Sequence, residues 1–269
     1  MPNLESFKNR VFCEDALDFL PKLPDNSIDC VLIDPPYCSG GVKSLNARNI
    51  STTKKYLGVP SYLDFEGDGK DQRLWIFWMA EILREIKRVL KPSAYFFSFI
   101  DWRQLPALSD TIQLADLAWR GVIVLNKGNG SRPFANAFKQ QCEFICWGTK
   151  GALPLSTRKE ANYYYGYVEA RINPKDKQHP TQKPLEVLKH CLQVVADTKT
   201  EATPIVLDCF CGSGSTGVAC AQLGLDFIGV EKVKEYALQA SINLEGALLE
   251  AQENKQKENK EGERIHVYF

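Results

Sequence analysis

Apolar runs of strand length alternate with segments of helical periodicity along most of the chain. The runs lie at residues 10–13, 28–33, 94–100, 121–125, 143–147, 205–208 and 226–231. Apolar residues that recur every three or four positions predict helices over 16–20, 74–90, 105–115, 185–196 and 216–223, and from 233 onward. This alternation indicates the α/β class, with a doubly wound, mostly parallel sheet.

Two polar segments interrupt the alternation. Residues 38–72 are rich in Gly, Ser, Asn, Thr and Lys, and residues 149–178 lack periodicity. Because long irregular segments in compact domains often carry function, we interpret both as insertions in a single domain over 1–250. The charged tail over 251–269 predicts a frayed helix or a solvated extension. We interpret the tyrosines in the second insertion (163–165 and 167) as packing for that insertion.

Composition narrows the class of protein. Lys and Arg together number 33, as do Asp and Glu, so any surface for nucleic acid must be a local patch. The N-terminus shows no signal pattern, and no apolar run reaches membrane-spanning length, which predicts a soluble, cytoplasmic protein with no membrane partner. The nine cysteines lack zinc-type spacing and histidines number three, so we expect reduced thiols and no metal.

The run over 28–33 ends abruptly in Asp34-Pro35-Pro36-Tyr37. Two prolines fix φ and remove backbone donors, so the strand cannot continue. The stiff edge offers a carboxylate, free carbonyls and an aromatic ring, which suits a planar group that carries an amine. A simple turn, in which Asp34 caps a following helix, is the alternative interpretation.

A second candidate site follows the run over 205–208. Asp208-Cys209-Phe210-Cys211-Gly212-Ser213-Gly214 precedes a predicted helix, whose N–H groups would face a ligand at this turn. Glu231 ends the next strand, at the offset of about 20 residues where an acidic side chain holds ribose hydroxyls. Gly217 completes a dinucleotide-type pattern, but little chain remains after it. A permuted order fits better, with the strand at 10–13 completing the cofactor half. Alternatively, the turn is only tight and Glu231 caps the next helix.

Four motifs, in this order, resemble the β-class DNA amino-methyltransferases. They are Asp34 to Tyr37, His179 to Pro184 (HPTQKP), Asp208 to Gly217 and Gly229-Val230-Glu231, and the resemblance covers most of residues 10–245. It implies a Rossmann-like class I methyltransferase fold with circularly permuted motif order. It also implies S-adenosylmethionine as the methyl donor, double-stranded DNA as the substrate and a bacterial or phage source, and it allows a homodimer and a restriction endonuclease counterpart.

The resemblance also implies roles for individual residues. The cofactor-binding residues would be Asp15, Thr181, Lys183, Asp208, Phe210, Gly212, Ser213, Gly214 and Glu231. Of these, Asp15 would meet the adenine amine of the cofactor and Glu231 the ribose hydroxyls. Thr181 and Lys183 would approach the methionine carboxylate, where a cation is favourable. The chain departs from the usual pattern at Ser215, where Thr is common.

The catalytic residues would be Asp34, Pro35 and Tyr37. The Asp34 carboxylate and the Pro35 carbonyl would accept hydrogens from an exocyclic amine, while Tyr37 stacks on a flipped-out base. A leading Asp favours the N6 amine of adenine, and the N4 amine of cytosine is the runner-up. A DNA-binding module with a dead cofactor site is the alternative from another class. Segments 38–72 and 149–178 are the candidate DNA-recognition elements.

Overall fold

The structure, a computed structural model, describes residues 4–37, 70–128, 135–136, 138–153, 161–170, 183–198 and 201–266. Its strands are β1 (Arg10–Cys13), β2 (Ile28–Ile33), β3 (Leu90–Ile100), β4 (Ala118–Asn126), β5 (Cys142–Thr149), β6 (Tyr167–Glu169), β7 (Ile205–Asp208) and β8 (Asp226–Glu231). Its helices are α1 (Ala16–Phe19), α3 (Gln72–Val89), α4 (Leu105–Leu114), α5 (Leu185–Ala196), α6 (Ser215–Leu223) and α7 (Lys234–His266), with short 3₁₀ turns η1 (Leu4–Ser6) and η2 (Leu20–Lys22).

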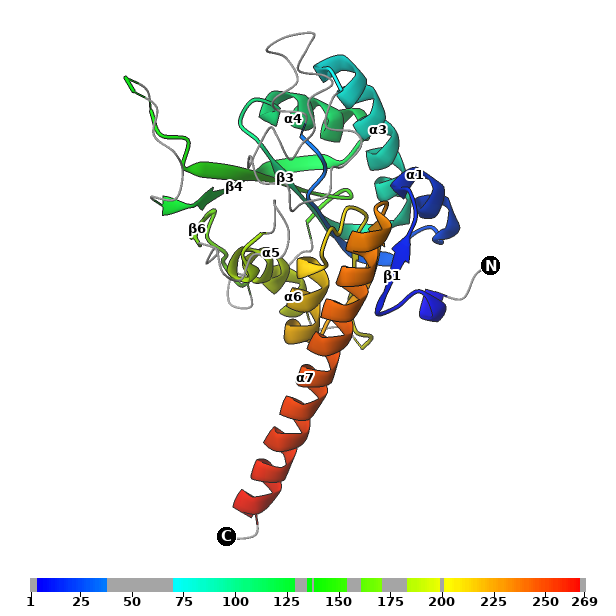
Figure 1. The fold of residues 1–269 in the computed structure, drawn as a ribbon, viewed down its shortest axis with the longest axis vertical. Coiled ribbons are helices and arrows are strands. Elements are labelled where there is room, and N and C mark those ends of the chain that lie inside the picture. Colours follow the sequence, from blue (N-terminus) through cyan, green and yellow to red (C-terminus); the bar gives the residue numbers. More distant parts are fainter. Residues whose placement is uncertain are drawn as a thin grey trace.

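Within the described residues the strands form a single sheet in the order β1-β8-β7-β2-β3-β5-β4-β6. Every pairing is parallel except those of β5, which runs antiparallel to both β3 and β4. The strand nearest the N-terminus, β1, pairs with β8 near the C-terminus, so the two ends of the chain build one half of the sheet (Figure 1). This arrangement confirms the predicted doubly wound, mostly parallel sheet and its permuted order.

Helices cover both faces of the sheet (Figure 1). One core lies under α1, α3 and α4, and the other under α5, α6 and α7. Strand β3 serves both cores by alternation, because Phe96 faces the first and Phe97 and Phe99 face the second. An almost continuous apolar run is what a strand buried on both faces requires.

The chain differs from the sequence-based prediction at two places. Strand β3 starts at Leu90, directly after α3, and includes Pro92, whereas the prediction started it at residue 94. A short strand, β6, lies inside the segment interpreted as an irregular insertion, and pairs with β4. The helix α7 runs without a break from Lys234 to His266, so the charged tail is helical as far as His266, which agrees with the first of the two alternatives predicted for it.

The interpretation of the tyrosine cluster as packing was wrong. Tyr163, Tyr165 and Tyr167 are exposed, the first two by 78% and 82%, and Tyr164 donates its hydroxyl hydrogen to Asp197 at the surface. Aromatic rings that pack an insertion would be buried, so these side chains lie on an outer surface beside β6.

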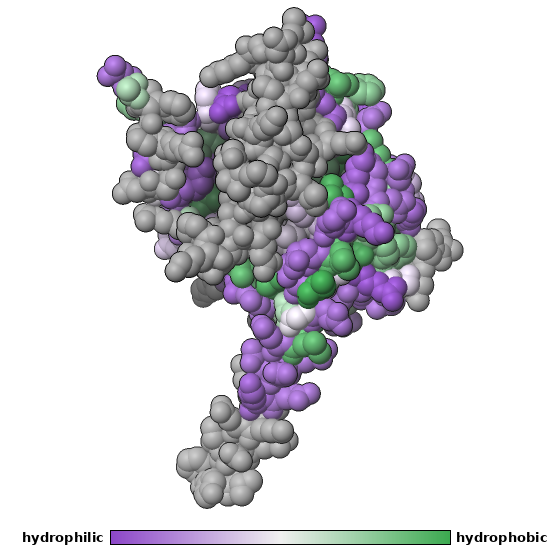
Figure 2. Space-filling view, in the orientation of Figure 1, coloured by the Kyte–Doolittle hydropathy of each residue, from purple (hydrophilic) through white to green (hydrophobic). Residues whose placement is uncertain are grey.

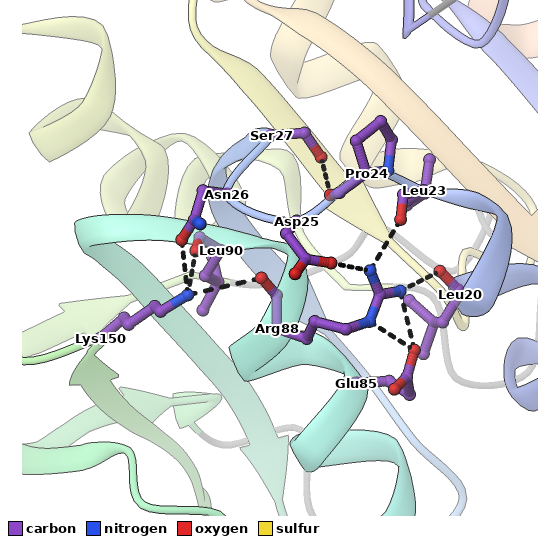
Figure 3. Close-up of polar contacts among 10 residues, drawn as sticks. All are labelled: Leu20, Leu23, Pro24, Asp25, Asn26, Ser27, Glu85, Arg88, Leu90 and Lys150. Atoms are coloured by element: carbon purple, nitrogen blue, oxygen red, sulfur yellow. Dashed lines mark hydrogen bonds and ion pairs between the residues drawn. The ribbon is translucent and has the colours of Figure 1, made fainter. Parts of the chain in front are cut away.

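A polar cluster fixes the end of β2 that lies opposite Asp34 (Figure 3). Arg88, in the last turn of α3, donates to the carbonyls of Leu20 and Leu23 at 2.8 and 2.9 Å and pairs with Asp25 and Glu85. Lys150 joins the cluster by donating to the Leu90 carbonyl at 2.8 Å. These contacts tie α3 to the turn that leads into β2 and so hold β2 in place.

The surface of α7 is mixed in character. Its later turns extend away from the rest of the protein (Figure 1), and hydrophobic side chains gather between polar ones near its start in Figure 2. Among the α7 residues whose burial is described, the exposed large apolar ones are Leu238, Ile242 and Leu249. None of the helices in the described ranges combines the length and the apolar character that crossing a membrane requires.

Candidate active site

Several acidic and basic side chains meet where the central strands end. The carboxyl end of β2 carries Asp34, and the neighbouring parallel strand β3 ends at the same edge. Because β5 is antiparallel to β3, it begins at this edge, with Ile100 opposite Phe144. The topology therefore brings Glu143, at the start of β5, to the side of the sheet that carries Asp34.

Lys183, just before α5, lies at the centre of this group. Its Nζ is 3.0 Å from Oδ2 of Asp34 and 3.2 Å from Oε2 of Glu143, and it donates to the Tyr37 hydroxyl at 3.0 Å. The other oxygen of Glu143, Oε1, accepts from Nζ of Lys127 at 2.9 Å. Lys183 is 8% exposed, and its ammonium also lies 4.9 Å from the ring centroid of Phe99. The site thus contains two carboxylates held by two ammonium groups.

Tyr37 completes the group from the other end of the 34–37 turn. Its hydroxyl donates to Oδ1 of Asp34, and its ring packs against both hydrophobic cores. Trp75 of α3 donates its indole N–H to the Pro36 carbonyl at 2.8 Å, and Pro35 is buried. The turn is therefore fixed by a strand, a helix and its own side chains. In the described residues Asp34 caps no helix, which removes the evidence for the simple-turn interpretation.

Burial and charge pull the pKa values of this group in opposite directions. Burial raises the pKa of Asp34 above its ordinary value, although Lys183 and Tyr37 oppose the change. Burial acts to raise the pKa of Glu143 too, but Lys183 and Lys127 outweigh it and lower that pKa to about 2. Burial lowers the pKa of Lys183, and the two carboxylates more than compensate. Lys183 and Glu143 therefore stay charged at neutral pH. Of the two carboxyl groups in this cluster, Asp34 is the easier to protonate.

The glycine turn after β7 forms a second constellation beside the first. Asp208 is buried, and it accepts hydrogen bonds from the Thr216 hydroxyl at 2.6 Å and the Phe210 N–H at 3.0 Å. Burial raises the pKa of Asp208 to about 7. Gly214 has φ of 86°, and a Cβ there would lie 2.9 Å from Ala240 of α7. This turn consequently requires glycine both for its conformation and for its close approach to α7.

Glu231 connects the turn to the start of α7. Its Oε2 accepts from the Gly212 N–H and its Oε1 from the Val233 N–H, both at 2.9 Å. The bond to Val233, next to α7, agrees with the alternative interpretation that Glu231 caps the next helix, but it uses only one of the two carboxylate oxygens. The other oxygen holds the glycine turn in place, next to the site predicted for ribose.

The structure brings most of the predicted cofactor residues together. Those between β7 and α7 are Asp208, Phe210, Gly212, Ser213, Gly214 and Glu231. Asp15 caps α1 by accepting from the Leu17 N–H, and it lies 3.4 Å from Lys232, the residue after Glu231. Lys183 lies instead with Asp34 and Glu143. Thr181, residues 38–69 of the first insertion, and residues 154–160 and 171–178 of the second lie outside the described residues.

Sequence reasoning missed Glu143 and Lys127 as members of the site. Lys127 was placed in the polar loop after the strand over 121–125 and Glu143 at the start of the strand over 143–147, and neither was given a role. The signal that was available is that a basic residue ends one strand and an acidic residue begins the next. Its meaning depends on knowing that β5 is antiparallel, which places both residues at the edge that carries Asp34. In the described part of the chain, this site included, no group of three or more His, Cys, Asp or Glu side chains is arranged to hold a metal ion.

Comparison with known proteins identifies the family. A model described as DNA methylase, for the N6 and N4 enzymes, matches residues 28–241. The chain belongs to this DNA methylase family. The match begins at β2, which leads to Asp34, and ends within α7, so it includes both constellations.

Curated relatives of this DNA methylase cover most of its length. The putative methylase YubD of Escherichia coli K12 is 28% identical over 222 residues, which make up 82% of this chain and 84% of YubD. The type II methyltransferase M2.DpnII of Streptococcus pneumoniae is 26% identical over 253 residues, which make up 86% of this chain and 87% of the relative. The resemblance noted from four motifs is thereby confirmed.

Solved structures show the same fold. The M1.HpyAVI–SAM complex has a TM-score of 0.59 and 24% identity, and the match covers 87% of this chain and 99% of that chain. The PvuII DNA methyltransferase, described as cytosine-N4-specific, has a TM-score of 0.64 and 17% identity, with 87% and 85% covered. The class I methyltransferase fold is therefore confirmed.

Proposed function

We propose that this DNA methylase transfers a methyl group from S-adenosylmethionine to the N6 amine of an adenine flipped out of double-stranded DNA. The observation that carries the proposal is the position of the fixed Asp34 carboxylate, which lies with Tyr37 at the end of β2. The neighbouring strand, β7, leads into the glycine turn. An acceptor of amine hydrogens thus stands beside a turn that suits a nucleoside. The relatives named as type II methyltransferases support this class of substrate.

Asp34 and its turn supply what an exocyclic amine needs in order to react. The lone pair of such an amine is delocalised into the base ring, so the nitrogen attacks poorly. An acceptor on each N–H, from the Asp34 carboxylate and the Pro35 carbonyl, favours the pyramidal nitrogen. Positive charge then grows on this nitrogen, and a fixed carboxylate stabilises it. Tyr37 holds the base in line by stacking.

The residues around the glycine turn fit the proposed cofactor. The positive φ of Gly214 and the absence of a Cβ at Gly212 let the backbone approach a nucleoside closely. Glu231 and the buried Asp208 offer carboxyl oxygens next to a cofactor that carries an ammonium group and a positively charged sulfur. S-adenosylmethionine supplies an activated methyl group on that positively charged sulfur. Asp15 and Thr181 remain proposed contacts to its adenine and carboxylate, whereas the Lys183 ammonium lies between Asp34 and Glu143.

The proposal also specifies which base is methylated. A leading Asp at position 34 favours adenine, and cytosine N4 is the second candidate because the fold of the cytosine-N4-specific PvuII enzyme is similar. The test incubates the purified protein with labelled S-adenosylmethionine and duplex DNA, then separates the nucleosides. Label in N6-methyladenine supports the proposal, and label in N4-methylcytosine selects the second candidate. Cofactor binding without transfer to any DNA would point to a DNA-binding module.

The remaining parts of the proposal concern DNA recognition and domain organisation. We infer that the segments over 38–72 and 149–178 recognise the DNA sequence. We also infer that a single catalytic domain over 1–250 carries the chemistry in the cytoplasm.

Two protein partners belong to the proposal as well. The exposed apolar residues of α7 offer a surface for a homodimer. Light scattering on the purified protein tests the oligomeric state. A restriction endonuclease counterpart is tested by whether the methylated DNA resists a nuclease encoded nearby.

A further inference from the structure

The ammonium of Lys183 is shared between two carboxylates. Its distances to Asp34 and Glu143 differ little, at 3.0 and 3.2 Å, and the Tyr37 hydroxyl is its third partner. An ammonium carries three N–H donors, so these contacts can use all of them. Because the side chain is buried, a small movement can shift the positive charge from one carboxylate to the other without exposing it to water.

The contact with Lys183 conflicts with the role proposed for Asp34. One oxygen of Asp34 accepts from Tyr37, and the other faces the lysine. To accept an amine N–H and stabilise a positive nitrogen, the carboxylate needs a free acceptor site and its full charge. A cation 3.0 Å away in a buried site cancels much of that charge. The Lys183 ammonium must therefore move away from Asp34 while the amine is bound.

Glu143 is the carboxylate toward which the Lys183 ammonium would move. It is held from its other side by Lys127, the residue that follows β4, the strand that pairs with β5. Two carboxylates and two ammonium groups balance in charge, so movement of Lys183 toward Glu143 leaves the net charge of the group unchanged. The hydrogen-bonded ladder of β4 and β5 fixes Glu143 while Lys183 moves.

We propose that Glu143 is a positioning residue that draws Lys183 off Asp34 when the target amine binds, and so frees Asp34 to accept that amine. This inference rests on the proposed methyl transfer, for adenine or cytosine alike. Without the charge of Glu143, the lysine has a single anionic partner in the group, and its ion pair with Asp34 tightens. Asp34 is then harder to protonate but poorer at binding the amine.

The first test is Glu143→Gln in the full chain. We expect kcat to fall about tenfold or more, with little change in KM for DNA or cofactor, because the misplaced charge acts on the reacting nitrogen. The acidic limb of the rate profile should move to lower pH, since Asp34 loses an anionic neighbour and gains a closer cation. Glu143→Asp keeps a carboxylate and should recover part of the rate. Glu85→Gln removes a similarly buried, ion-paired carboxylate at the opposite edge of the sheet, and should change neither quantity.

The second test does not depend on activity. Carbon-13 NMR of carboxyl-labelled aspartate follows the titration of Asp34, whose resonance is assigned by its loss in Asp34→Asn. The groups that act on it are Tyr37, Lys183 and Glu143, with Asp208 farther off. We expect the pKa of Asp34 to fall in Glu143→Gln. It should rise in Lys127→Met, where Lys183 becomes the sole cation among the described residues in contact with Glu143.

The outcomes separate the two proposals. An Asp34 pKa that stays the same in a folded Glu143→Gln protein overturns the positioning role, whatever the enzyme methylates. If Glu143→Gln does not fold, an Asp34 pKa that does not rise in Lys127→Met overturns it instead. If the two variants show both pKa shifts but the wild-type protein methylates no DNA, the proposed function is overturned and the charge relationship stands.

Discussion

Asp34 and Lys183 form a buried ion pair, with 3.0 Å between Oδ2 and Nζ, although one residue ends β2 and the other precedes α5. The pair joins two motifs that are far apart in the sequence. Each residue also contacts Tyr37. The ring proposed to stack on the base, the proposed amine acceptor and the cation therefore form one unit. A substitution at any of the three should therefore affect the others, and their effects on rate should not add.

Replacement of Asp34 tests the acceptor. In Asp34→Ala the amine loses its carboxylate, and we expect methyl transfer to fall by about two orders of magnitude or more. Cofactor affinity, measured by calorimetry, should change little because the glycine turn is intact. Asp116→Asn removes an exposed carboxylate on the surface and serves as the control. Near-normal transfer by Asp34→Ala would show that another group accepts the amine.

Two replacements of Tyr37 separate its ring from its hydroxyl. Tyr37→Phe keeps the stacking surface and loses the hydrogen bonds to Asp34 and Lys183, so we expect a moderate fall in kcat. Tyr37→Ala also loses stacking, which contributes about 1–3 kcal/mol per base in single-strand binders, so KM for DNA should rise as well. Steady-state kinetics on one duplex measures both. Equal kinetics for the two variants would argue against a stacking role.

Gly214 and Gly246 allow a matched pair of glycine-to-alanine substitutions. In Gly214→Ala the new Cβ meets α7 at 2.9 Å and φ is positive, so the free energy of unfolding should fall by about 1–3 kcal/mol. A weaker affinity for S-adenosylmethionine should accompany it. Gly246→Ala lies in α7 with nothing within 4 Å of the new Cβ, and it should raise stability by about 1 kcal/mol. Urea unfolding and calorimetry measure both, and a neutral Gly214→Ala would contradict the close approach.

The order of strands and motifs could be predicted because the apolar runs and glycine turns are local signals. The run over 205–208, its turn and Glu231 each depend on residues that are close in sequence. The edge at 34–37 was also recognisable, since two prolines must end a strand. The permuted order followed from how little chain remains after Gly217.

The network around Lys183 could not be predicted in the same way. It depends on β5 running antiparallel to β3, and apolar runs do not report strand direction. Lys183 was assigned to the cofactor on the resemblance alone, whereas its contacts in the structure are Asp34, Glu143 and Tyr37. The strand β6 has only three residues, too few for a periodic signal.

The cluster around Arg88 should support the fold without touching the chemistry. Arg88→Met leaves the carbonyls of Leu20 and Leu23 without their donor and two carboxylates without their partner. We expect the free energy of unfolding to fall by about 2–4 kcal/mol, with kcat unchanged at temperatures where the protein is folded. Arg84→Met, at an exposed position of the same helix, is the matched control. A large fall in kcat for folded Arg88→Met would mean that the position of β2 is more sensitive than we infer.

The buried carboxyl of Asp208 should make stability depend on pH. Burial raises its pKa to about 7 from an ordinary value of 3.8, so between these values the folded protein holds a proton that the unfolded chain releases. The stabilisation by this proton is fully present below about pH 4 and is lost as pH rises through 7, by up to about 1.4 kcal/mol per pH unit. Asp208→Asn cannot ionise, so its stability relative to wild type should improve from pH 5 to about pH 7 in urea unfolding and level off above that pH. Asp116→Asn should keep a constant difference over that range. A constant difference for Asp208→Asn too would show that Asp208 is already charged at pH 5.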